Sequence, residues 1–140
     1  MLDIEKIKKA PVISRRMAII DYLCKLSGLD IYYLFSLLNM YNAKNKGRWF
    51  WQKASFTGFL KDDFNNFNNF MDKFSSQFRT MDEGKINSSL DEANRLLVKL
   101  VSDLEASMLL NRETDRIDIL SYLDDNIKSL VDQSLKAVKS

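Results

Sequence analysis

The stretch from residue 56 to residue 81 reads FTGFLKDDFNNFNNFMDKFSSQFRTM and decides the fold class. Its apolar residues recur at intervals of three and four, which places them along one side of an α-helix, whereas a half-buried strand would alternate every second residue. The stripe consists of Phe56, Leu60, Phe64, Phe67, Phe70 or Met71, Phe74, Phe78 and Met81. We therefore expect a long helix that Thr57 caps and Gly84 ends.

The seven phenylalanines between residues 56 and 78 bear on the size of the core and on self-association. Side chains of this bulk usually lie inside, so we expect the stripe to fill the core of a thick helical bundle. A stripe exposed in part would instead form a large apolar patch, which is rare on a monomer. A homodimer is therefore an alternative that the sequence leaves open.

The helical spacing continues on the C-terminal side of this stretch. Ser88 or Ser89 begins the next helix, and Glu92 completes a capping box with the second of these serines. Thr114 then caps a last helix that runs to within a few residues of the end. Three long helices joined by short connections are expected to run antiparallel.

Shorter helices are expected on the N-terminal side. Asp3 caps the first, which a proline soon ends because the residue before proline avoids the α conformation. Ser14 caps the second, and Gly28 ends it in a left-handed conformation. Asp30 starts the third, which reaches about residue 41.

The composition agrees with an all-α fold. The 140 residues include one proline and four glycines, too few for the frequent turns of a strand-rich domain. The length suits one domain, residues 1–140, in which three long antiparallel C-terminal helices form a bundle and two or three shorter N-terminal helices pack on it. Because the first helix is marginal, we expect residues 1–13 to be loosely ordered.

Charge is distributed unevenly along the chain. Residues 1–60 carry ten Lys and Arg against four Asp and Glu, whereas residues 61–140 carry eleven against fifteen. The basic first part, which includes Arg15 and Arg16, is typical of a surface for nucleic acid or for an acidic partner. The two parts would alternatively neutralise each other when they pack together.

The residue types argue against an enzyme. The chain has no histidine, which removes the commonest general base and the imidazole metal ligands. Cys24 is the single cysteine, so no internal disulfide forms and the cytoplasm is the simplest compartment. Phosphate-binding glycine loops, calcium loops, a signal peptide and an apolar run long enough to span a membrane are all missing from the sequence. We expect no cofactor and no metal.

The segment NAKNKGRWFWQKAS, residues 42–55, interrupts the helical periodicity and mixes cations with aromatics. Such a mixture binds phosphates while stacking on unpaired bases, and it also anchors partner proteins. In a structural alternative the aromatic side chains plug one end of the bundle and the cations stay solvated. The candidate residues for a partner or a nucleic acid are Lys44, Lys46, Arg48, Trp49, Trp51 and Lys53, together with Arg15 and Arg16.

Our leading hypothesis is a non-catalytic protein–protein interaction module, such as an adaptor, an inhibitor or an immunity-type protein, of microbial or viral origin. The alternative is a small helical accessory subunit that binds nucleic acid through residues 44–53. A third hypothesis places the basic, amphipathic opening on a membrane surface. The sequence identifies no particular partner.

Overall fold

The computed structural model describes residues 2–45 and 58–139, which form seven α-helices and one 3₁₀ helix. No strand occurs within these two ranges, and the all-α prediction is confirmed. The elements are α1 (Ile4–Lys9), α2 (Val12–Leu26), α3 (Ile31–Asn45), α4 (Gly58–Gln77), η1 (Phe78–Thr80), α5 (Glu83–Ser107), α6 (Arg116–Leu120) and α7 (Asp125–Lys139). Thr57, the expected cap of the phenylalanine-rich helix, lies outside the described residues.

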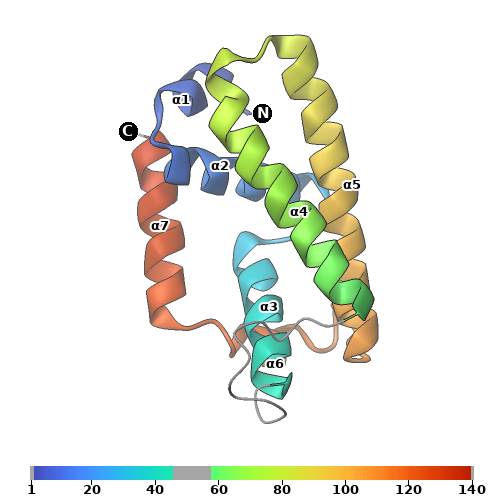
Figure 1. The fold of residues 1–140 in the computed structure, drawn as a ribbon. Coiled ribbons are helices and arrows are strands. Elements are labelled where there is room, and N and C mark those ends of the chain that lie inside the picture. The colour runs from blue at the N-terminus through green and yellow to red at the C-terminus, as the bar shows by residue number, and fades with distance from the viewer. Residues whose placement is uncertain (1, 46–57, 140) are drawn as a thin grey trace.

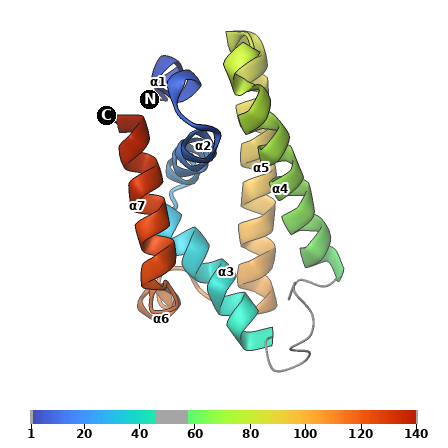
Figure 2. The ribbon, with the colours of Figure 1, turned by 60° about the vertical axis from the view of Figure 1, so that its left-hand side comes forward.

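The helices surround α2. The two longest, α4 and α5, form an antiparallel hairpin, and α2 lies between this hairpin and α7 (Figure 1). Figure 2 shows the same order from a second direction, with α3 below α2 and next to α5. The helical bundle is confirmed, but its exact arrangement as three long C-terminal helices is not, because α7 packs mainly against α2.

The predicted last helix is in fact two helices, α6 and α7. The Asp124 carboxylate accepts a hydrogen bond from the Ile127 N–H at 2.8 Å, which caps a new helix. A tertiary contact with α3 also stabilises the connection between α6 and α7, since the Asn39 amide donates a hydrogen bond to the Tyr122 carbonyl at 3.1 Å. Ile117, Leu120, Leu123 and Ile127 recur at intervals of three and four across the break, so the helical spacing of the sequence conceals it.

Predicted boundaries near the N-terminus are largely confirmed. Asp3 caps α1, Asp30 caps α3 by accepting from the Tyr32 N–H at 2.7 Å, and Gly28 has a φ of 69° after α2. The cap of α2 was predicted wrongly: the helix begins at Val12 behind Pro11, which needs no N–H partner there, and Ser14 is buried inside the first turns.

The boundary between the two longest helices also differs from the prediction. A short 3₁₀ turn follows α4, and Asp82 caps α5 by accepting from the Lys85 N–H at 2.8 Å. Gly84 therefore lies in the first turn of α5 and does not end the preceding helix, and Ser88 and Ser89 lie inside α5. The Asp82 carboxylate at the cap position therefore determines where α5 begins, and Gly84 does not determine where α4 ends.

A turn at Asn111–Asp115 replaces the Thr114 cap. The Asn111 side chain accepts from the N–H groups of Glu113 and Thr114, and the Asp115 carboxylate accepts from the Asn111 N–H. The chain then enters α6 at Arg116. The chain reversal predicted at residues 111–115 is confirmed, but the side chain of Asn111 stabilises it instead of Thr114.

The described part of the phenylalanine stripe packs into the interior, as predicted, while Phe56 lies outside the described residues. Phe67, Phe74 and Phe78 are buried, and Phe70 meets Phe74 edge to face with ring centroids 6.0 Å apart. Residues 1–13, expected to be loosely ordered, contain α1 with Ile7 buried against the core.

Leu109 ends α5 in a strained conformation. It has a φ of 55°, the left-handed region that favours glycine, and its side chain is 92% exposed. The Leu110 N–H bonds to the Glu105 carbonyl and the Leu109 N–H to the Ala106 carbonyl, which together make the double hydrogen bond of a Schellman motif. The leucine side chain gains almost no burial in return.

Leu109→Gly is expected to stabilise the protein by about 1 kcal/mol and to raise Tm by roughly 4 °C, because the left-handed strain disappears. Thermal unfolding followed by circular dichroism measures the change. Leu109→Ala is the matched control, since it removes the exposed side chain but keeps the Cβ atom and the strain. Equal stabilisation by both variants would show that the backbone conformation is not the cause.

Candidate interaction surfaces

Arg15 lies in the interior instead of on the surface. Its guanidinium donates to the carbonyls of Ile7 at 3.2 Å, Ser75 at 2.7 Å and Ala10 at 3.0 Å. These bonds join α1 and α2 to the end of α4, and the side chain is only 5% exposed. Arg15 therefore has a structural position, and we leave it out of the surface considered for a protein partner.

The other predicted residues fall into two groups. Arg16 is half-buried on α2 and donates to the Asp72 carboxylate and to the Asn68 side-chain oxygen on α4. Lys44 is exposed in the last turn of α3. Lys46, Arg48, Trp49, Trp51 and Lys53 lie outside the described residues.

An apolar pocket of about 360 Å³ opens between α2, α3, α4 and α7. It reaches inward as far as Leu100 of α5, which is buried. Its polar lining consists of Arg16 and Asn68, which bond to each other at one side. The apolar lining consists of Ile13, Met17, Ile20, Leu34, Phe35, Leu38, Phe64, Phe67, Leu100 and Leu130.

Two aliphatic side chains at this pocket are largely in solvent. Ile13 on α2 is 58% exposed, and Leu130 on α7 is 48% exposed. Val12, the neighbour of Ile13, is also exposed. Scattered exposed aliphatics are common, but here two of them line one deep apolar pocket, which is the usual form of a binding site.

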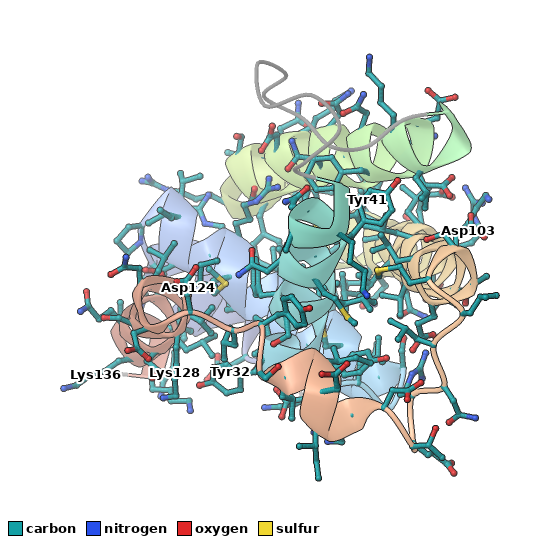
Figure 3. The ribbon with its side chains drawn as sticks, turned by 90° about the horizontal axis from the view of Figure 1, so that it is seen from below. Tyr32, Tyr41, Asp103, Asp124, Lys128 and Lys136 are labelled. Atoms are coloured by element: carbon teal, nitrogen blue, oxygen red, sulfur yellow. The ribbon has the colours of Figure 1, made fainter. Side chains whose placement is uncertain are left out.

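Polar contacts fix α7, which forms one wall of the pocket. Tyr32 of α3 donates a hydrogen bond to Asp132 of α7, and Lys128 lies 5.6 Å from the centre of the Tyr32 ring. Figure 3 shows Tyr32 and Lys128 side by side between these two helices. The bond to Asp132, followed by burial, raises the pKa of Tyr32 to about 12, so this phenol keeps its proton and remains a donor.

A second tyrosine ties the end of α5 to the neighbouring turn. Tyr33 donates to Glu105, whose carboxylate also accepts two hydrogen bonds of 2.9 Å from Arg112. Burial and the bond to Glu105 raise the pKa of Tyr33 well above its usual range. The group is a satisfied network and offers no reactive phenolate.

Asp63 is a buried acid between the two longest helices. Lys99 Nζ lies 3.4 Å from its Oδ1 and 2.9 Å from Oδ2 of Asp103, while Asp63 Oδ2 has no hydrogen-bond partner among the described residues. Burial, and next the contact with Asp103, raise the pKa of Asp63, whereas the same contact lowers the pKa of Asp103. Asp63 is therefore the member of the pair whose pKa is raised.

Other side chains that could support chemistry are inert in their surroundings. Burial raises the pKa of the Cys24 thiol to about 12, with smaller effects from Asp21 and Asp30, so the nucleophilic thiolate is suppressed. The described residues contain no cluster of three or more His, Cys, Asp or Glu side chains placed to hold a metal ion. Within the same residues, none of the helices combines the length and the apolar character needed to cross a membrane.

The sequence reasoning missed the pocket. Its apolar residues other than Ile13 were predicted on the apolar faces of separate helices, and the pocket exists only because five helices bring those faces together. A local signal did exist at α2, where Val12 and Ile13 precede the predicted cap and so fell outside the predicted helix. No such signal marks Leu130, which has the same spacing as the buried residues of α7.

Comparison with models of known families, with curated proteins and with solved structures finds no match in any of the three. The function must therefore be inferred from the residues and contacts of this chain.

Asp63→Asn is expected to raise stability at neutral and alkaline pH, because the amide stays neutral where the buried carboxyl group would have to ionise. The pKa of Asp63 is raised on folding, so its contribution is fully present below the unfolded pKa of about 4 and is lost as the pH rises through the raised value. Urea unfolding between pH 4 and pH 9 measures this effect. The difference in the free energy of unfolding between Asp63→Asn and wild type should be small at pH 4 and should increase as the pH rises.

Asp62→Asn is the matched control for this measurement, since Asp62 is the exposed neighbour on the same helix. It should change the free energy of unfolding by less than about 0.5 kcal/mol, as is usual at an exposed position. A constant difference between Asp63→Asn and wild type across the pH range would mean that folding does not raise the pKa of Asp63.

Proposed function

We propose that this protein is a non-catalytic interaction module, and that a partner protein inserts a large apolar side chain into the pocket between α2, α3, α4 and α7. The observation that carries the proposal is the exposure of Ile13 and Leu130 at a pocket that extends to Leu100. Partner proteins characteristically bind through a few bulky side chains that fill well-formed pockets, surrounded by contacts that exclude water.

The electrostatics of the pocket favour an apolar anchor. Arg16 is the charged residue of the lining, and its charge is matched by Asp72. A charged side chain entering the pocket would lose its hydration without gaining a free counter-ion, and this desolvation costs several kcal/mol. Leucine, phenylalanine or tryptophan fits the lining and a volume of about 360 Å³.

Several parts of this proposal rest on the sequence. The absence of histidine and the buried state of Cys24 support a role without catalysis. The single cysteine supports the cytoplasm as its compartment. Microbial or viral origin and a homodimer remain predictions, and so does nucleic-acid binding through residues 44–53, because most of that segment lies outside the described residues.

Leu130→Glu is expected to weaken partner binding at least tenfold, because a carboxylate at the mouth opposes entry of an apolar side chain. Immobilised wild type and variant are used to capture proteins from a lysate of the source organism, and the bound proteins are quantified by mass spectrometry. At least one protein should be recovered by wild type and lost with Leu130→Glu.

Val98→Glu is the matched control, since Val98 is 41% exposed on α5 and does not line the pocket. It should recover the same proteins as wild type, and thermal unfolding should show that both variants fold. Identical recovery by all three proteins, or no specific capture by wild type, would contradict the proposal.

A further inference from the structure

A basic hollow of about 360 Å³ lies where the end of α1 meets η1, away from the apolar pocket. Its lining residues are Lys8, Lys9, Ala10, Arg15 and Arg79, so four of the five carry a positive charge. Figure 1 shows α1 beside the end of α4 that leads into η1. The hollow and the apolar pocket have no lining residue in common.

The most unusual member of this group is Arg15, a buried cation without a counter-ion. Its three hydrogen bonds go to neutral carbonyls, and no carboxylate among the described residues forms an ion pair with it. Three of the five guanidinium N–H groups are used, which leaves two donors. Burial, and next the charge of Arg79, lower the pKa of Arg15. A buried charge normally has a partner of opposite sign.

The other three cations are also without ion pairs among the described residues. Of the acids near Arg79 in the sequence, Asp72 pairs with Arg16, and Asp82 caps α5. Glu5 and Glu83 are exposed and form no ion pair with any described residue. Among the described residues, therefore, no ion pair compensates the positive charge around the hollow.

Helix capping explains part of this charge and leaves the rest. Lys8 and Lys9 are in the last turn of α1, where a cation stabilises the helix dipole. That effect gives no reason for Arg79, which belongs to another element, to lie beside a buried arginine. An anion in the hollow would compensate all four charges together.

We propose that the hollow binds a phosphate group, held by Lys8, Lys9 and Arg79 at its edge and by Arg15 at its base. Arginine matches the oxygen geometry of phosphate through paired N–H donors, and lysine adds mobile charge. The hollow is wide enough for a phosphate and part of the molecule that carries it, so inorganic phosphate and a phosphomonoester share the required chemistry. The site is independent of the proposed protein-binding pocket.

The test measures thermal unfolding of the full chain in phosphate and in chloride at equal ionic strength. Wild type should gain roughly 8 °C in Tm when phosphate is at one hundred times its Kd, and calorimetric titration with inorganic phosphate should give that Kd. Titration with glycerol 3-phosphate in parallel identifies the source. Equal binding indicates a site for phosphomonoesters, and weaker binding indicates free phosphate.

Arg79→Gln gives the decisive comparison, because it has opposite effects in the two solutions. In chloride it should raise Tm, since repulsion of Arg15 is removed; in phosphate it should lose most of the gain in Tm. Lys9→Gln should weaken phosphate binding about tenfold. Lys61→Gln is the control, since Lys61 is an exposed lysine of α4 outside the hollow, and it should behave like wild type in both solutions.

Phosphate also stabilises proteins without binding, by exclusion from their surface, and the variants separate this general effect from a site. An equal rise in Tm for wild type, Arg79→Gln and Lys61→Gln would overturn the proposal. So would the absence of heat on titration of wild type with inorganic phosphate, or a lower Tm for Arg79→Gln in chloride.

Discussion

Burial of α2 on several sides is the constraint on which the rest of the structure depends. Met17, Ile19, Ile20, Leu23 and Cys24 are all buried, and they cover more of the helix circumference than one apolar stripe. One neighbouring layer cannot cover such a helix, so the α4–α5 hairpin packs on one side and α7 on another. The break between α6 and α7 is required by this arrangement, because a single straight helix after α5 would follow the hairpin and leave α2 open to water.

The sequence was most informative where a single local interaction determines the structure. Asp3, Gly28 and Asp30 were placed correctly because a side-chain cap or a left-handed glycine acts within four residues. Errors arose where two local signals competed, as at Asp82 and Gly84, or where a tertiary contact held the backbone, as at Tyr122. Helical spacing alone could not reveal the break before α7, since both flanking helices bury a face toward the same core.

The candidate sites were less predictable than the helices, because they are assembled from distant residues. Arg15 and Arg16 are neighbours and both basic, yet one is buried against three carbonyls and the other pairs with Asp72 near the surface. Successive residues of a helix point about 100° apart, so their environments are set by whichever helices pack on each side. The apolar pocket has the same origin, since its apolar lining residues other than Ile13 have the spacing of ordinary core positions.

Few ion pairs join the basic first part of the chain to the acidic second part. Had the basic and acidic parts neutralised each other, many ion pairs would join a cation of residues 1–60 to an acid of residues 61–140. Among the described residues Arg16–Asp72 is the one such pair, while Arg116–Asp30 runs in the opposite sense and the remaining pairs lie within one part. Among the described residues, ion pairs with the acidic part therefore offset little of the positive charge of the first part. Around Arg15 it is joined by Arg79, and a concentration of like charge at a buried group persists most readily where an external anion balances it.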